Sequence, residues 1–213
     1  MYPLRLSEAS KDDVLLPALD EWRENLDPEL ASRLAIDYGR RPTVEEIGWY
    51  VFAILSAPSF RTRFSASLAI DHPRIPFPAG ERVFRALTKL GSELGRAHLL
   101  EAPISADIRF EGGGTNAIDA VRYDADTHRV WVNATQAFTG ISNDGWVWGE
   151  HFRPIQHYLD DRRGRRLDTE QIQGFQSAIH AVQECIRLAP ALDNALAEVL
   201  SRPLSFTDPF AKE

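Results

Sequence analysis

The sequence contains very little cysteine and very little lysine. The single cysteine, Cys185, cannot form an internal disulfide and excludes a cysteine-based zinc site. Lysine occurs only three times, so arginine carries nearly all of the positive charge. No uninterrupted apolar run is long enough to cross a bilayer, which predicts no membrane span and a cytoplasmic location. The remaining composition, 44% hydrophobic and 26% charged, is that of an ordinary globular protein.

Common motifs of catalysis and phosphate binding are also missing. No Gly-x-Ser-x-Gly string is present, which excludes a nucleophile elbow. The triple glycine at 112–114 is not followed by Gly-Lys-Ser/Thr, so it predicts a turn rather than a phosphate-binding loop. His151 and His157 lack a third ligand, and Asp124 and Asp126 lack the rest of a calcium loop. The sequence therefore predicts no catalytic residue, metal or cofactor in this chain.

The formal net charge of −7 is unevenly distributed along the chain. Residues 1–37 hold nine acidic and four basic residues, a net charge of −5, which leaves −2 for the remainder. The overall charge argues against tight binding of an acidic polymer through charge alone. A nearly neutral remainder with arginine clusters can still contact phosphate locally.

The most informative stretch runs from residue 158 to residue 167 and places four arginines around Gly164. They are Arg162, Arg163, Arg165 and Arg166. Asp168 and Gln171 have capping-box spacing, so a helix is predicted to begin directly after the run. A flexible arginine loop in front of a rigid helix is one way to hold a nucleic acid. The alternative is a solvated turn whose partners are Asp160 and Asp161.

Hydrophobic periodicity and turn signals predict an α+β fold, mainly helical, with a small antiparallel β-sheet or hairpin in the middle of the chain. We expect helices at 28–38, 44–57, 59–70, 80–100, 153–161, 168–189 and 191–200, the last two separated by Pro190. Strands are expected at 104–110, 117–123 and 129–133. The predicted organisation is an acidic N-terminal segment, 1–42, followed by one domain, 43–213. That domain divides into helical 43–102, β-containing 103–150, helical 151–202 and a loose tail, 203–213.

Five segments, taken in order, carry a resemblance to a known family. They are Tyr2-Pro3-Leu4, Trp49 to Arg61, Pro73-Arg74-Ile75-Pro76, Tyr123 to Gln136, and Ile155 to Leu167. In this order they resemble the C-terminal specificity region of Type ISP restriction–modification enzymes, whose last segment also contains an Asp-Arg-Lys-Gly-Arg run before a long helix. The sequence departs from the family pattern at Ala57-Pro58-Ser59-Phe60 and between Trp148 and Phe152.

The resemblance implies a DNA-binding, target-recognition module of a phage-defence system, not catalytic by itself. The chain has no Asn-Pro-Pro-Tyr loop of an adenine methyltransferase and no lysine two residues after an acid, as a common restriction-nuclease core requires. S-adenosylmethionine, ATP and Mg²⁺ are therefore implied only for other domains. The implied partners are duplex DNA and the methyltransferase and helicase domains of the same or a neighbouring polypeptide. The alternative is a scaffold that packs on the methyltransferase without reading bases.

Candidate DNA-binding residues follow from the arginine clusters and the nearby aromatic residues. One set comprises Arg61, Arg63 and Arg74, and the other comprises Arg153, Arg162, Arg163, Arg165 and Arg166. Trp146 and Trp148 could stack on bases, or they could pack the interior. Asn133, Gln136 and Asn143 are further candidates as readers of base edges.

Overall fold

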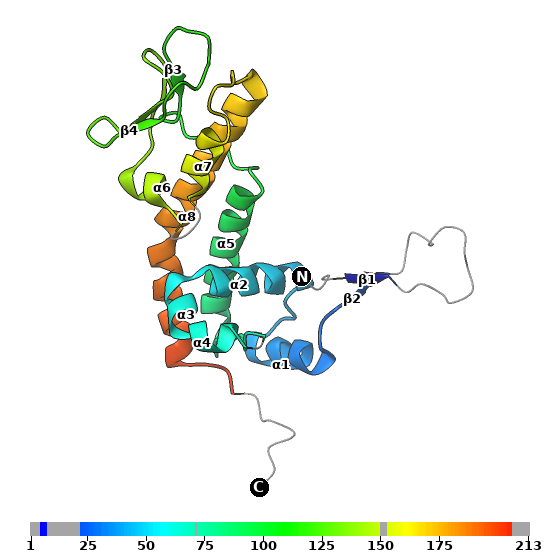
Figure 1. The fold of residues 1–213 in the computed structure, drawn as a ribbon. Coiled ribbons are helices and arrows are strands. Elements are labelled where there is room, and N and C mark those ends of the chain that lie inside the picture. Colours follow the sequence, from blue (N-terminus) through cyan, green and yellow to red (C-terminus); the bar gives the residue numbers. More distant parts are fainter. Residues whose placement is uncertain (1–4, 8–21, 71, 150–152, 206–213) are drawn as a thin grey trace, which may run out of the picture. The chain divides into compact units, whose positions relative to one another are not determined.

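The computed structural model describes residues 5–7, 22–70, 72–149 and 153–205 (Figure 1). The helices are α1 Pro28–Tyr38, α2 Val44–Ser56, α3 Pro58–Arg63, α4 Ser65–Leu68, α5 Glu81–His98, α6 Asn143–Val147, α7 Pro154–Asp160 and α8 Thr169–Ser201. The strands are β1 Arg5–Ser7, β2 Trp22–Glu24, β3 Phe110–Glu111, β4 Arg122–Asp124, β5 Arg129–Trp131 and β6 Ala137–Phe138. The predicted mainly helical α+β class is confirmed. Tyr2-Pro3-Leu4 and residues 150–152 of the resemblance lie outside the described residues.

The chain forms two compact units. Unit 1 comprises Met1–Ser92 and Ala191–Glu213, and unit 2 comprises Glu93–Pro190. Both boundaries fall inside helices, one within α5 and the other within α8. The boundaries proposed from the sequence, at residues 42, 102 and 150, remain predictions.

Two helix starts form as their sequences predict. At the start of α2, the Thr43 side chain accepts from the backbone N–H of Glu46, and the Glu46 carboxylate accepts from the backbone N–H of Thr43. Before α8, Asp168 and Gln171 make the same reciprocal pair of hydrogen bonds. Each pair satisfies backbone donors that the helix itself leaves without an acceptor, which fixes where the helix begins.

Unit 1 packs around the aromatic residues of α1, α2 and α5 and of the proline-rich connector between α4 and α5, residues 72–79. Tyr50 is fully buried, and its ring stacks on Phe77 and Phe84 with centroids 5.0 Å from each. Its hydroxyl donates to the carbonyl of Pro76, and the Tyr38 hydroxyl donates to that of Pro78. Proline carbonyls in the connector thus become acceptors for buried phenols, which ties the extended segment to the helices.

Unit 2 contains a four-stranded antiparallel sheet with the strand order β3-β6-β5-β4. Side chains alternate between its two faces, as the period of a strand requires. The inner face carries Phe110, Phe138, Val130 and Tyr123, which join the hydrophobic core of the unit. This core also includes Ile155 and Leu159 of α7 and Phe175, Ile179 and Val182 of α8.

Several expected boundaries differ from those observed. The helix expected at 59–70 is divided into α3 and α4 at Phe64, whose φ of −109° and ψ of 16° are not helical. The strand expected at 104–110 is reduced to its last residue, because a turn closes at 105–108, where the Ile108 N–H donates to the carbonyl of Ser105. Of the strand expected at 117–123, only its end belongs to β4. Strand β6 and helix α6 were not predicted, because two and five residues are too few to show a period.

The expected break at Pro190 is wrong: α8 runs through it without interruption, as the orange-to-red helix in Figure 1 shows. Proline removes one helical hydrogen bond and commonly costs about 3 kcal/mol. Leu188 and Leu192 on either side are buried, and this burial offsets that cost. Pro203 and Leu204, expected in the loose tail, instead pair with the connector, since Leu204 N–H donates to the Phe77 carbonyl. Residues 206–213 lie outside the described residues.

Candidate functional site

The arginine loop, residues 162–166 between α7 and α8, is fixed through its backbone. Gly164 N–H donates to the Ile118 carbonyl at 2.8 Å, and Ile118 N–H donates to the Arg165 carbonyl at 2.9 Å. The backbone N–H of Leu167, which follows the loop, donates to the Asn116 carbonyl at 2.9 Å. Segment 116–118 and the loop therefore pair like antiparallel strands, with Ala117 opposite Arg166. The expectation of a flexible loop is wrong for the backbone, because these hydrogen bonds hold it against segment 116–118.

The four arginine side chains of the loop divide into two pairs. Arg162 lies over the Tyr158 ring at 3.7 Å from its centroid and donates to the Tyr158 carbonyl. Arg163 forms an ion pair with Asp160 at 2.7 Å. Arg165 and Arg166 are exposed, and neither side chain has a hydrogen-bond or ion-pair partner among the described residues. The solvated-turn interpretation thus holds for Arg163, whereas Arg165 and Arg166 present uncompensated charge from a fixed backbone.

A network of side-chain amides supports segment 116–118 from the other side. Gln136 is 2% exposed; its Nε2 donates to Asn116 Oδ1 at 2.8 Å, and its Oε1 accepts from the Asn116 N–H at 2.8 Å. Asn133 Nδ2 donates to Gln136 Oε1 and to the Ala117 carbonyl. Because these groups bond to one another, Gln136 and Asn133 hold the segment in place and are not available as readers of base edges. Asn143 is also engaged, since its Oδ1 accepts from the Tyr123 hydroxyl at 2.7 Å.

The other candidates of unit 2 are Arg153, Trp146 and Trp148. Arg153 is exposed just before α7, whereas the loop follows α7, so the seven residues of the helix separate them by about 10 Å along its axis. Trp146 stacks on Tyr123 with centroids 5.2 Å apart and packs against the core. Packing thus accounts for Trp146, whereas Trp148 is 37% exposed.

The outer face of the sheet contains a tryptophan–arginine group that the sequence interpretation did not identify. Trp131 of β5 lies beside Arg122, its partner on β4, and Arg129, two residues earlier on its own strand, with each guanidinium about 6 Å or less from the ring centroid. Glu111 pairs with Arg129 at 3.3 Å. The indole Nε1 is buried and has no hydrogen-bond partner among the described residues, so packing and the two cations position the ring. Alternation in 122–124 and 129–131 was the signal that could have revealed this face.

An open depression of about 410 Å³ adjoins Trp131 on this face. It is lined by Asp119, Ala120, Arg122, Trp131, Asn133 and Ala134. Asp119 is exposed and has no side-chain partner within the described part of the chain. The depression therefore combines an aromatic wall, a cation and an uncompensated carboxylate.

The first arginine set lies in unit 1. Arg61 and Arg63 are exposed on the last turn of α3, and Arg74 is exposed in the connector. Arg63 lies 5.6 Å from the centroid of the Phe64 ring and borders a depression of about 480 Å³ against α8. No acidic side chain pairs with these three arginines among the described residues.

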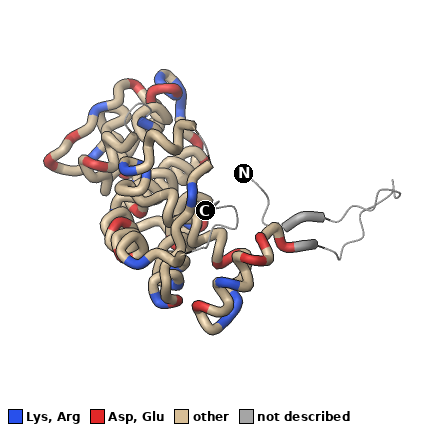
Figure 2. The backbone as a smooth tube through the Cα atoms, turned by 90° about the horizontal axis from the view of Figure 1, so that it is seen from below, with Lys and Arg blue, Asp and Glu red and all other residues tan. Residues whose placement is uncertain are grey.

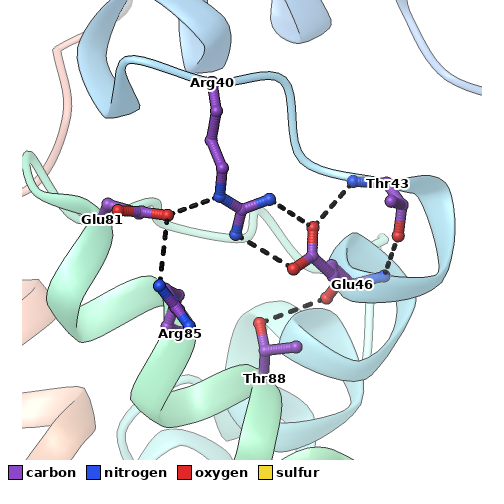
Figure 3. Close-up of polar contacts among 6 residues, drawn as sticks. All are labelled: Arg40, Thr43, Glu46, Glu81, Arg85 and Thr88. Atoms are coloured by element: carbon purple, nitrogen blue, oxygen red, sulfur yellow. Dashed lines mark hydrogen bonds and ion pairs between the residues drawn. The ribbon is translucent and has the colours of Figure 1, made fainter.

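A different arginine of unit 1, Arg40, is fully engaged (Figure 3). Its guanidinium makes a bidentate pair with Glu46, at 2.7 and 3.0 Å, and donates through Nε to Glu81. The hydrogen bonds from Arg40 hold the pKa of Glu46 below its usual range. Glu81 also faces Arg85, and Thr88 of α5 donates to the Glu46 carbonyl. This network joins the segment after α1 to the starts of α2 and α5, so its role is structural.

Charge of neither sign dominates the described chain. Figure 2 shows the basic and acidic positions interspersed along the backbone. No group of three or more histidine, cysteine, aspartate or glutamate side chains among the described residues is placed to hold a metal ion. Within the same residues, no helix is long and apolar enough to cross a membrane.

Comparisons with known proteins bear on this arrangement. A family model described as the Type ISP C-terminal specificity domain matches residues 1–188. The fold resembles a nuclease-deletion mutant of the Type ISP enzyme LlaGI in complex with a DNA substrate mimic, with a TM-score of 0.54 and 16% identity over 71% of this chain. It also resembles the ATP-dependent Type ISP enzyme LlaBIII bound to DNA, with a TM-score of 0.61 and 15% identity over 88% of this chain. A third similar structure is the DrdV–DNA complex, with a TM-score of 0.59 and 17% identity over 81% of this chain.

The match covers only a small part of those larger chains: 14% of LlaGI, 13% of LlaBIII and 20% of DrdV. At sequence identities of 15–17%, the similarity to these structures shows a shared fold. Comparison with curated proteins gives no match.

Proposed function

The chain belongs to the family of Type ISP C-terminal specificity domains, and on this premise we propose that it is a target-recognition module that contacts duplex DNA. Two of the similar solved structures, LlaBIII and DrdV, are bound to DNA, and the third, LlaGI, is bound to a DNA substrate mimic, which supports this proposal. Because the chain spans at most 20% of those proteins, we propose that methyltransferase and helicase domains are its partners in the assembled enzyme. S-adenosylmethionine, ATP and Mg²⁺ would be used by those domains, in the cytoplasm.

One observation carries the proposal: two adjacent arginines have fixed backbones, and their side chains have no partner within the described part of the chain. Their backbone is paired with segment 116–118, which the Gln136 amide network supports. Arg165 and Arg166 therefore project charge from a defined position at little further cost in backbone entropy. Phosphate is a suitable ligand for such guanidinium groups, because their planar N–H groups can donate two parallel hydrogen bonds to its oxygens.

The first experiment tests the arginine loop by charge removal with a matched control. The double variant R165A/R166A should weaken binding of duplex DNA of any sequence and reduce the salt slope by roughly 0.9 for each lost phosphate contact. The control is R187A, which removes one exposed arginine of the same unit that is already paired with Glu184 at 2.6 Å. Fluorescence anisotropy over a range of salt concentrations gives both quantities.

The wild-type chain should bind weakly, at about 10⁻⁴ to 10⁻⁶ M, because its net charge is negative. R187A should retain nearly all of that affinity. A loss in R187A about half as large as that in R165A/R166A, in proportion to the charge removed, would show that only net charge matters. Unchanged binding in the double variant, both alone and with the partner domains, would favour the scaffold alternative.

We further propose that the chain is not catalytic by itself. The sequence has no Asn-Pro-Pro-Tyr loop and no nuclease lysine, which supports this proposal. Incubation with labelled S-adenosylmethionine and duplex DNA should transfer no label above that of a heat-denatured sample. Reproducible transfer by the pure chain would contradict the proposal.

A further inference from the structure

The outer face of the sheet has features of a site that reads base edges rather than phosphates. Its exposed groups include Arg122 and Asp119, which line the same depression beside Trp131. A carboxylate repels a phosphate, so this pair of opposite charges is poorly suited to the DNA backbone. A base pair, in contrast, presents both acceptors and donors.

Arg122 lies on the exposed edge of the sheet. Strands β4 and β5 form a hairpin joined by the turn at 125–128; β4 is the edge strand, whereas β5 also pairs with β6. Asp124 accepts from the N–H groups of Asp126 and Thr127, which fixes this turn. The major groove of B-DNA is wide enough for a two-stranded ribbon.

The chemistry of the two side chains matches one base pair. We propose that Arg122 and Asp119 recognise a G·C pair in the major groove, with Arg122 donating to guanine O6 and N7 and Asp119 accepting from the cytosine N4 amino group. Trp131 limits the directions open to Arg122, because the guanidinium lies 5.7 Å from the ring centroid. Asp119 is held by its own backbone, since its N–H donates to the Val132 carbonyl at 2.8 Å.

This inference rests on the proposed contact with duplex DNA but concerns different residues. The arginine loop supplies contacts that ignore sequence, whereas Arg122 and Asp119 discriminate between bases. The two sets are therefore separable by experiment: losing the first weakens binding to every duplex, and losing the second changes which duplex is preferred.

The experiment is a selection from a pool of randomised duplexes with the 213-residue chain, followed by sequencing of the bound fraction. The wild type should enrich a site that contains a G·C pair. R122A and D119A should each lose the preference at that same position, by about 10- to 100-fold, and keep the preferences elsewhere. R122K should lose guanine preference as well, because lysine cannot make the bidentate contact.

The matched control is R109A, because Arg109 is exposed near the same sheet but is paired with Glu111 at 3.5 Å. It should leave the preferred site unchanged, and near-ultraviolet circular dichroism should show that every variant is folded. Affinity for the unselected pool and its salt slope should stay within about twofold of wild type in R122A and D119A, since no phosphate contact is lost.

Four results would overturn the inference. The first is an unchanged preferred site in both R122A and D119A. The second is a uniform loss of affinity with a flatter salt slope in R122A, which would make Arg122 a phosphate contact. The third is wild-type binding without any sequence preference; this would leave the proposed DNA contact intact if R165A/R166A still weakens it. Absence of any binding by the wild type would remove both the inference and the proposed function.

Discussion

Arg40 of unit 1 and the arginine loop of unit 2 contribute to the protein in opposite ways. In unit 1, Arg40 donates to Glu46 and Glu81 and joins three segments, so its charge is compensated within the fold. In unit 2, the backbone of the arginine loop supplies the structural contacts, and the side chains of Arg165 and Arg166 remain without partners among the described residues. An arginine is therefore a better binding candidate when its backbone makes the structural hydrogen bonds and its side chain does not.

The largest expected loss of stability comes from removing a buried aromatic ring, and we expect it in both units. Phe138 is fully buried, 4.4 Å from Phe175 and 4.6 Å from Phe110 between ring centroids. F138A should lower the free energy of unfolding by about 3–5 kcal/mol, because it removes a ring and leaves a cavity. The matched change in unit 1, F84A, should cost a similar amount. Urea denaturation measures both, and a loss below 1 kcal/mol in either would contradict this view.

A smaller effect is expected from the amide network under the arginine loop. Q136A leaves the Asn116 N–H without its acceptor and removes one of the two acceptors of the Asn133 amide, at a cost of at most about 1–3 kcal/mol for each partly buried group left unpaired. Amide hydrogen exchange at Ile118 and Gly164 should become faster, since the support of their pairing is lost. Q173A, on the exposed side of α8, is the control. Equal exchange rates in the two variants would refute the supporting role.

The arginine network of unit 1 should contribute less, because its members are partly exposed. R40A should cost about 1–2 kcal/mol, below the value for fully buried charged hydrogen bonds. The control R33A removes an exposed arginine paired only with Asp37 and should cost at most about 0.5 kcal/mol. Thermal unfolding at neutral pH distinguishes the two, and equal losses would mean that Arg40 has no special role.

The same network predicts a dependence on pH. Because Arg40 lowers the pKa of Glu46 in the folded state, the contribution of Glu46 is complete above the usual glutamate pKa of about 4.3 and is lost as the pH falls through the lowered value. E46Q lacks this titration. The difference in stability between wild type and E46Q should therefore shrink as the pH is lowered below about 4. A stability difference between wild type and E46Q that grows as the pH falls would contradict this prediction.

The smallest expected effect on stability is that of the proposed contact residues. R165A/R166A should change the free energy of unfolding by no more than about 0.5 kcal/mol, because exposed side chains without partners stabilise little. Together with a clear loss of DNA binding, this result would sharpen the contrast with Arg40. A loss of 2 kcal/mol or more would instead show that the two arginine side chains stabilise the fold.

Local signals in the sequence were sufficient for several elements of this protein. The capping box at Asp168 and the helix at 28–38 formed as predicted, and the helix expected at 44–57 begins with a capping box at Thr43. Each depends on hydrogen bonds between residues only a few positions apart, so the signal and the structure lie in the same short segment. The order of five short segments likewise predicted the family.

Only the tertiary structure decided which polar residues remain available. Gln136 and Asn133 look like base readers in the sequence, but partners up to 24 residues away engage them. Residues 116–118, about 50 positions before the arginine loop, fix its backbone. Such pairings depend on how the whole chain closes on itself, and no local pattern encodes them. The sequence thus determined where the arginines and the helix starts lie, whereas long-range hydrogen bonding decided which side chains were left to bind.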